Sequence, residues 1–172
     1  PLHGYGCHMK DAKKLSGLDR VTEQAARAKK AALSLARLGA AEKNAFLARL
    51  AEVIEERRDA ILAANRRDIA QSEKDGATKA FLDRLVLTPE RVRKLSHSLE
   101  AVVALDDPVG AVLKETRRPN GLLIRKVRVP IGVIAIVYES RPDVTIEAAS
   151  LCVKSGNAVI LRGGSEAWRS NA

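Results

Sequence analysis

The segment Arg162-Gly163-Gly164-Ser165-Glu166 contains the residue types of a ligand-binding loop. Its two glycines let the backbone approach a ligand closely, and Ser165 can cap a following helix. The segment follows an apolar stretch, and loops after the strands of α/β sheets are where such proteins hold ligands. The pattern alone is weakly specific, because a plain turn after a strand has a similar composition. The dinucleotide fingerprint G-x-G-x-x-G is absent, since Gly4 and Gly6 follow no strand.

A second polar segment, Tyr138 to Asp143, also follows an apolar stretch and includes Ser140 and Arg141. The carboxyl ends of parallel strands meet at one edge of a sheet, so we expect both loops to share one rim. A ligand that contacts one loop would then contact the other.

The remaining reactive side chains are poorer candidates for chemistry. Cys152 lies within an apolar helical pattern, which indicates a structural residue, and His97 lies off the apolar stripe of its helix, which indicates a surface residue. Cys7 is near the N-terminus with His3 and His8, and three soft ligands in a loose tail do not form a closed metal site. We therefore predict no metal centre.

The two loops require a βαβ unit between residues 131 and 162 to position them. Ile131 to Tyr138 is a continuous apolar run typical of a buried parallel strand, Asp143 to Lys154 is helical, and Ala158 to Arg162 is a second apolar strand. Ser155-Gly156-Asn157 ends the helix between them. The order predicts a doubly wound α/β fold with a right-handed crossover.

The upstream residues predict helices and then a hairpin. We expect helices from Asp19 to Leu38, from near Glu42 towards Asn65, and from Thr88-Pro89 to about residue 106, because Thr88 is a good N-cap and Pro89 suits the first helical position. Strands from Val109 to Thr116 and from Leu122 to Val129 flank Asn120-Gly121, a strong hairpin signal. Residues 1 to 18 are expected to be a disordered tail.

Composition indicates a globular protein of a reducing, cytoplasmic compartment. The chain is 46% hydrophobic and 30% charged, it has two cysteines, and its longest apolar run is too short to span a membrane. The net charge of +9 keeps open an alternative, a basic helical protein that binds nucleic acid without catalysis. Against it, basic and acidic residues alternate along the helices and only 3% of residues are aromatic, so we expect no specific nucleic-acid binding.

Three ordered motifs resemble the gamma-glutamyl phosphate reductase family of the aldehyde dehydrogenase superfamily. They are Val129-Pro130-Ile131-Gly132-Val133, Tyr138-Glu139-Ser140-Arg141-Pro142-Asp143, and the run from Ser155 through Asn157 to Arg162-Gly163-Gly164-Ser165-Glu166. With Leu82-Asp83-Arg84-Leu85 and Asp107-Pro108-Val109-Gly110, the resemblance covers about nine-tenths of the chain. Arg162 stands where the wider superfamily has a lysine, and Gly163-Gly164 replaces its proline, as in the reductase branch.

The resemblance implies an activity and a truncated chain. The reaction is the NADPH-dependent reduction of L-glutamyl 5-phosphate to glutamate 5-semialdehyde, in which a cysteine thiolate displaces phosphate. That cysteine lies in the second half of a longer chain in the family, so residues 19–172 would be a partial NADP-binding domain (helices 19–106, hairpin arm 109–129, βαβ unit 131–162), the catalytic domain would be absent, and the fragment would be inactive. The full-length enzyme would be a homo-oligomer joined through the hairpin, with glutamate 5-kinase as pathway partner and no membrane.

The resemblance also assigns roles to the two loops. Arg162, Gly163, Gly164, Ser165 and Glu166 would face the adenosine ribose of NADP, where Arg162 can pair with the 2′-phosphate; the alternative is a surface arginine at a strand end. Ser140 occupies the position of an oxyanion-hole asparagine in many relatives. Arg141 would bind the acyl phosphate or the substrate carboxylate, unless it forms a salt bridge with Glu139 or Asp143.

Overall fold

The structure is a computed structural model that describes residues 17–172. The expected tail therefore lies almost wholly outside the described residues, together with His3, Cys7 and His8. The elements in chain order are α1 Gly17–Leu35, α2 Ala40–Glu56, α3 Arg58–Lys74, α4 Lys79–Leu85, α5 Pro89–Ala104, β1 Val112–Arg117, β2 Leu123–Val127, β3 Val133–Val137, α6 Pro142–Lys154, β4 Ala158–Arg162, a 3-10 turn Ser165–Ala167 and α7 Trp168–Asn171.

The predicted βαβ unit is present and forms the centre of the molecule. Strands β3 and β4 are parallel, with Val133 opposite Ala158 and Val137 opposite Arg162. Helix α6 ends at Lys154 and is followed by Gly156, which has a positive φ of 73°. The buried Asn157 accepts a hydrogen bond from the Gly132 N–H at 2.8 Å. The turn after α6 is thereby tied to the start of β3, which sets the register of the two strands.

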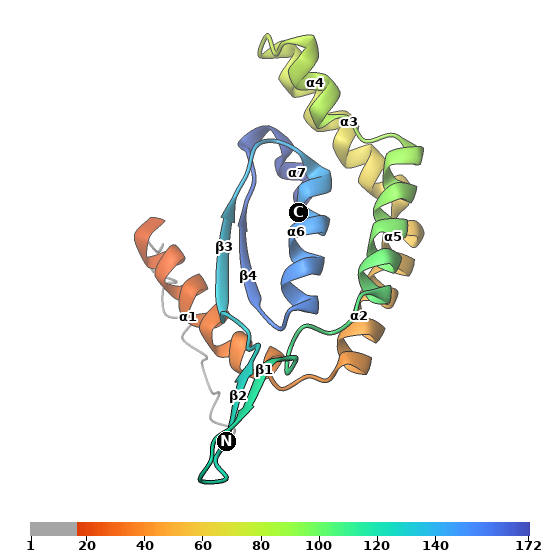
Figure 1. The fold of residues 1–172 in the computed structure, drawn as a ribbon. Coiled ribbons are helices and arrows are strands. Elements are labelled where there is room, and N and C mark those ends of the chain that lie inside the picture. The colour runs from red at the N-terminus through yellow and green to blue at the C-terminus, as the bar shows by residue number, and fades with distance from the viewer. Residues whose placement is uncertain (1–16) are drawn as a thin grey trace, which may run out of the picture.

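The elements are layered around this sheet. Helix α1 lies on one face of β3 and β4, α6 lies on the other, and α2 and α5 cover the far side of α6 (Figure 1). Leu47 on α2 and both Val92 and Leu99 on α5 are fully buried, because the apolar stripes of the two helices face each other and pack against α6. No helix of residues 17–172 is long and apolar enough to cross a membrane.

Three helix predictions need correction. The first helix spans Gly17–Leu35 rather than Asp19 to Leu38, and the stretch from Glu42 to Asn65 is two helices that meet at Arg57. This break has no local signal, because the sequence around it contains neither glycine nor proline. Helix α4 was not predicted, although the Thr78 hydroxyl accepts a hydrogen bond from the Phe81 N–H and so caps it.

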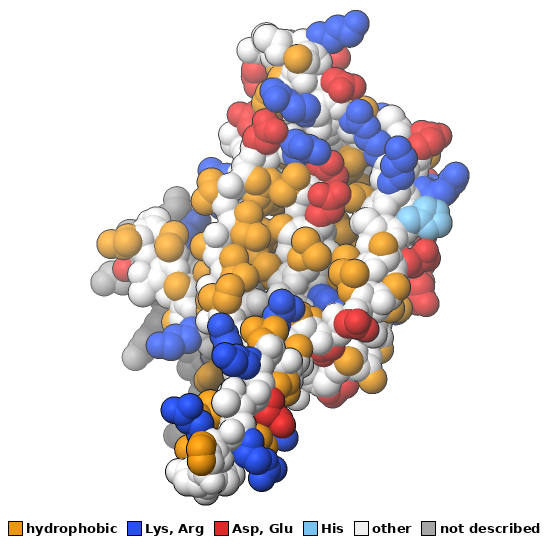
Figure 2. Space-filling view, in the orientation of Figure 1, with side chains coloured by type: hydrophobic (Ala, Val, Ile, Leu, Met, Phe, Trp, Pro, Cys, Tyr) orange, Lys and Arg blue, Asp and Glu red, His pale blue; other side chains and the backbone are white. Residues whose placement is uncertain are grey.

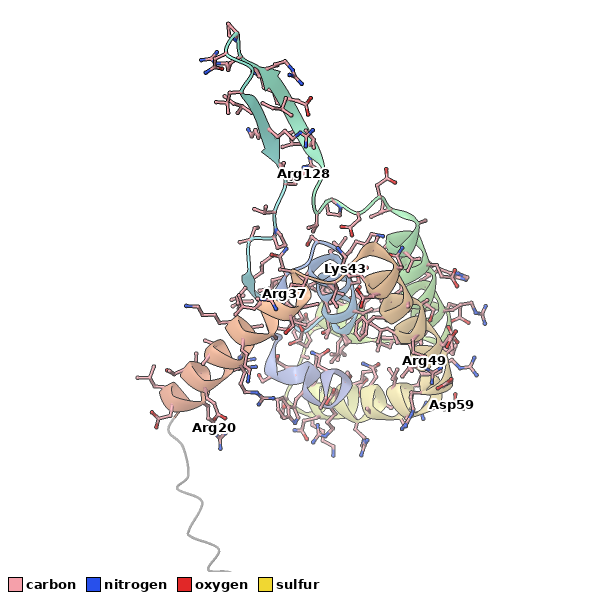
Figure 3. All side chains as sticks on the ribbon, turned by 90° about the horizontal axis from the view of Figure 1, so that it is seen from below. Arg20, Arg37, Lys43, Arg49, Asp59 and Arg128 are labelled. Carbon is pink, nitrogen blue, oxygen red and sulfur yellow. The ribbon has the colours of Figure 1, made fainter. Side chains whose placement is uncertain are left out.

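The start of α5 and the hairpin are confirmed. Thr88 caps α5 and Pro89 is its first residue. Strands β1 and β2 pair antiparallel, and the Arg118 N–H donates to the Leu122 carbonyl at 2.8 Å to close the turn. The hairpin projects from the body, with Arg128 at its base (Figure 3). Its strands are almost entirely exposed, so their pairing depends on few contacts with the rest of the chain.

Candidate cofactor-binding site

Both predicted loops lie at one rim of the sheet, where β3 and β4 end. The Tyr138 N–H donates to the Arg162 carbonyl at 3.1 Å, which extends the ladder by one bond beyond the last residue of β3. Segment 138–143 and segment 162–166 therefore leave the sheet side by side. Residues that are more than twenty positions apart in the sequence can contact one ligand here.

The two loops are joined by Ser140 and Glu166. Ser140 is buried, with 5% of its surface exposed, and its hydroxyl donates a hydrogen bond to the Glu166 carboxylate. This bond, followed by one from the Glu166 backbone N–H, lowers the pKa of Glu166, and smaller contributions from Ser165 and Arg162 act in the same direction. Glu166 is therefore held ionised and fixed in orientation at the rim.

Gly164 packs directly against this link. A Cβ atom at position 164 would lie 2.9 Å from the Ser140 backbone nitrogen and would also collide with the Ser140 hydroxyl. Position 164 therefore cannot accept a side chain without moving one of the loops. Ser165 was expected to cap a following helix; instead it is the first residue of the 3-10 turn, Gly164 precedes that turn as its N-cap, and the Ser165 hydroxyl donates to Glu166 at 3.2 Å.

A cleft of about 710 Å³ opens beside the second loop. Such a volume is within the range of roughly 300 to 1,000 Å³ that small-molecule sites occupy. Its lining combines apolar and polar groups, namely Tyr138, Thr145, Leu161, Arg162, Gly163, Gly164, Ser165, Trp168, Asn171 and Ala172. This mixture of apolar surface with a few convergent polar groups is typical of sites for cofactors.

The residues of the cleft fit an adenine dinucleotide in kind. Trp168 is 72% exposed and offers a flat apolar surface, and Gly163 leaves its backbone open to the cleft. The Arg162 side chain is exposed and donates only to the carbonyl of its neighbour Gly163, so its guanidinium is free to turn towards an anion. These residues can therefore supply a stacking surface, backbone contacts and a cation.

Sequence reasoning missed the polar residues on the wall of this cleft. The Tyr138 hydroxyl is 2.6 Å from the Thr145 hydroxyl, which in turn donates to the Asn171 amide oxygen at 2.8 Å. Asp68 of α3 holds the segment that carries Asn171, because its carboxylate accepts from both the N–H and the hydroxyl of Ser170 at 2.7 Å. The contacts of Asp68 span about a hundred positions and leave no pattern in the sequence.

Arg141 faces a different cleft. Its guanidinium forms an ion pair with Asp143 at 3.0 Å, and this hydrogen bond is the main reason that its pKa is raised. Glu139, the other partner that the sequence offered, pairs with Arg84 at 3.6 Å. The structure thus contains one of the two anticipated salt bridges, while Arg141 remains partly exposed.

The other candidates for chemistry are accounted for by their surroundings. Cys152 is a buried free cysteine whose thiol pKa is raised by burial, so it is a poor nucleophile. His97 is exposed and contacts Glu100 at 3.1 Å, as expected for a surface residue. Neither side chain lines the rim clefts.

Comparison of the fold with solved structures defines the class. A probable aldehyde dehydrogenase from Listeria monocytogenes superposes with a TM-score of 0.63 at 16% identity, over 88% of this chain and 31% of that structure. Gamma-glutamyl phosphate reductase from Thermotoga maritima superposes with a TM-score of 0.87 at 43% identity, over 89% of this chain and 37% of that structure. The chain thus has the mixed α/β fold of the N-terminal portion of aldehyde-dehydrogenase-type proteins, which confirms the predicted fold class.

Sequence comparison is more specific. The chain is 49% identical over 154 residues to gamma-glutamyl phosphate reductase of Carboxydothermus hydrogenoformans, covering 90% of this chain and 37% of the relative. It is 54% identical over 145 residues to the reductase of Moorella thermoacetica, covering 84% of this chain and 35% of the relative. No known protein-family profile matches the chain. The resemblance to the N-terminal part of gamma-glutamyl phosphate reductases is therefore confirmed, and the chain spans little more than a third of the curated relatives it matches.

Proposed function

We propose that the chain is part of an NADP-dependent gamma-glutamyl phosphate reductase, which reduces L-glutamyl 5-phosphate to L-glutamate 5-semialdehyde and releases phosphate. The observation that carries the proposal is the rim where Ser140 and Glu166 join the two loops beside a cleft of about 710 Å³. The relatives that share about half of the residues are named for this reaction. Bound NADPH would supply the hydride, and the residues described above would bind and orient it.

Within this proposal the second loop recognises the adenosine end of the cofactor. Arg162 pairs with the 2′-phosphate, the backbone of Gly163 and Gly164 lies against the ribose, and Ser165 and Glu166 bind ribose hydroxyls. The exposure of Arg162 supports its role. Glu166 is not among the residues that line the cleft, and it meets the cleft through Ser165, whose hydroxyl donates to its carboxylate. Guanidinium and phosphate form bidentate, charge-assisted hydrogen bonds, which are stronger than neutral ones.

The experiment that tests this assignment is Arg162→Ala, with binding of NADPH and NADH measured by fluorescence titration. NADPH differs from NADH by the 2′-phosphate, so we expect NADPH affinity to fall about ten- to hundred-fold and NADH affinity to change little. Arg93→Ala, an exposed arginine of α5 that does not line the cleft, is the matched control. Equal losses for both cofactors would show that Arg162 supports the loop instead of reading the phosphate.

Ser140 and Arg141 would serve the substrate side of the rim, with Ser140 as an oxyanion contact and Arg141 on the acyl phosphate or carboxylate. We propose that the chain alone is inactive, because Cys152 is buried and its thiol pKa is raised. A chimera tests the activity: this chain replaces the N-terminal third of the Moorella thermoacetica reductase. We expect the chimera to form semialdehyde and the chain alone to form none; turnover by the chain alone would contradict the proposal.

We further propose that the hairpin from β1 to β2 is an oligomerisation arm of the complete protein. Its projection from the body and its exposed apolar residues Leu113 and Ile124 support this role. Deleting residues 117–123 in the chimera should give monomers in sedimentation velocity, and an unchanged assembly would refute the arm. A glutamate 5-kinase would supply the acyl phosphate in the cytoplasm, where the free thiol of Cys152 stays reduced.

A further inference from the structure

A second cleft, of about 400 Å³, is lined by residues of α4, α5 and α6 and of the segments next to these helices. Its lining includes Arg141, the residue after Ser140, so the cleft opens at the same rim as the proposed cofactor site. Its wall is dominated by charged side chains of both signs. A cleft that was built only for an anion would not place carboxylates beside the bound charge, because they would repel it.

Most of these charges already have partners within the chain. Arg91 donates to the Val86 carbonyl at 2.7 Å and pairs with Asp83, and Arg141 pairs with Asp143 at 3.0 Å. Arg84, at the mouth, pairs with Glu139 at 3.6 Å. These side chains hold one another in place and so fix the shape of the cleft. Their hydrogen-bonding groups are only partly available to a ligand.

Two charges of opposite sign remain. Lys94 on α5 and Glu147 on α6 line the cleft from facing helices, and neither side chain forms a hydrogen bond or ion pair within residues 17–172. The Glu147 carboxylate is close enough to Arg141 to help raise its pKa. One cation and one anion that lack hydrogen-bond partners within the described residues, on facing helices, are complementary to a small ligand that carries both charges.

We propose that this cleft binds the zwitterionic head of an α-amino acid, with Glu147 accepting hydrogen bonds from the ammonium group and Lys94 donating to the α-carboxylate. The inference rests on the proposed function and deepens it, because it names the part of the substrate that is recognised. The side chain of the amino acid then extends along Arg141 towards the rim. Its reactive end would thus meet the cofactor site rather than open solvent.

Three commercial ligands separate the two charges of the head group. L-glutamate has both, glutarate lacks the ammonium group, and 4-aminobutyrate lacks the α-carboxylate. We expect L-glutamate to bind this chain up to about five-fold more tightly than either analogue in NMR titrations, since each exposed charge pair contributes up to about 1 kcal/mol. Equal affinity for glutarate would show a simple anion site, and no binding of any of the three would overturn the proposal.

Two variants test which side chain recognises which charged group of the ligand. Glu147→Gln should remove the discrimination between L-glutamate and glutarate, and Lys94→Gln should remove the discrimination between L-glutamate and 4-aminobutyrate. Both positions are exposed, and Glu100→Gln and Lys74→Gln are matched controls outside the cleft. In the chimera, each of the two cleft variants should raise KM for the amino-acid substrate while kcat is retained. Discrimination that survives both substitutions would overturn the assignment.

NADPH titration of the same samples separates this proposal from the proposed function. Binding of NADPH without selective binding of L-glutamate would refute the amino-acid site and leave the reductase proposal standing. Selective binding of L-glutamate without any affinity for NADPH would refute the proposed function and leave an amino-acid site of another kind.

Discussion

Two ion pairs with the same N–O distance occupy opposite environments in this molecule. The Lys43 ammonium lies 2.6 Å from the Asp107 carboxylate in the helical body, and Arg125 lies 2.6 Å from Glu115 on the hairpin. The side chains of the first pair are 1% and 18% exposed, and those of the second are 55% and 49% exposed. The two ion pairs therefore affect stability differently despite their equal distances, because water already solvates the charges of the hairpin pair.

The difference extends to the neighbourhood of each pair. Lys43 points into the interior between α2 and the segment that follows α5, whereas Arg49 of the same helix and Asp59 lie at the periphery (Figure 3). Another buried lysine, Lys154 of α6, donates to the Val103 carbonyl at 3.0 Å and adds its charge near Asp107. In the body, polar side chains join elements distant in sequence, whereas on the hairpin they join adjacent strands.

The molecular surface also differs between the body and the hairpin. Figure 2 shows hydrophobic side chains gathered over the sheet and α6 in the middle of this face, and basic side chains over the projecting hairpin. Ile131, just before β3, and Val137, the last residue of β3, are apolar and are 83% and 81% exposed. The burial of apolar side chains therefore decreases from the helices to the sheet and then to the hairpin.

The largest expected effect comes from Asn65→Ala in the body, compared with Asn120→Ala on the hairpin. Asn65 is 1% exposed; its amide donates to the Leu85 carbonyl at 2.9 Å and accepts from the Leu87 N–H at 2.8 Å. Removing it leaves two backbone groups unpaired, so we expect a loss of about 3 to 4 kcal/mol in the free energy of unfolding, measured by urea denaturation.

Asn120→Ala is the matched control for this loss. Its side chain accepts one exposed hydrogen bond, from the Leu122 N–H at 3.2 Å, and water can replace it. We expect a change of less than about 1 kcal/mol. Comparable losses for the two variants would contradict the view that burial, rather than bond geometry, distinguishes the two regions.

A smaller effect is expected from Asp107→Asn, with Glu115→Gln as its hairpin counterpart. The first change leaves Lys43 buried without a counter-charge and should cost about 2 kcal/mol, less than for a fully enclosed pair because Asp107 is partly exposed. The second should change stability little. Circular dichroism during urea unfolding measures both, and a larger loss for Glu115→Gln would reverse the comparison.

The pair in the body also makes stability depend on pH. Burial would raise the pKa of Asp107, but hydrogen bonds from Lys43 and the Val109 N–H, together with the charges of Lys43 and Lys154, outweigh it and lower the pKa. The stabilisation is present above the unfolded-state pKa of about 4 and is lost as pH falls through the lower folded-state pKa. The acid slope should be shallower in Asp107→Asn than in the unsubstituted chain.

The elements that follow from local signals could be predicted from the sequence, and those fixed by distant contacts could not. Thr88-Pro89 and Asn120-Gly121 place the start of α5 and the hairpin turn because capping and turn chemistry act within a few residues. The break at Arg57 separates two helices with no glycine or proline nearby. It has no local signal because the packing of α2 on α5 and of α3 on α7 positions the two helices.

The candidate site likewise combines features that the sequence predicts with features that depend on distant contacts. The shared rim of Ser140 and the segment from Arg162 to Glu166 follows from the βαβ order alone, since parallel strands end at one edge. The walls of the candidate cofactor cleft depend on Asp68, whose carboxylate holds Ser170 from a helix about a hundred residues upstream. Lys94 and Glu147 were equally invisible, because charged residues on helices are usually solvated and only the crossing of α5 and α6 brings these two together.

The smallest expected effect concerns the rim, where the buried Ser140 hydroxyl donates a hydrogen bond to the exposed Glu166 carboxylate. The hydrogen bond from Ser140 is the largest cause of the lowered pKa of Glu166, so Ser140→Ala should raise that pKa towards its ordinary value. A lowered folded-state pKa contributes stability above the unfolded-state pKa, and that contribution disappears on acidification; Ser140→Ala should therefore flatten the acid slope, by less than Asp107→Asn does. NMR titration of the Glu166 side-chain carboxyl carbon measures the pKa directly, and Ser165→Ala, which removes a weaker hydrogen bond at 3.2 Å, is the matched control. An unchanged Glu166 pKa in Ser140→Ala would show that the backbone N–H and the charge of Arg162 hold the carboxylate without help from the first loop.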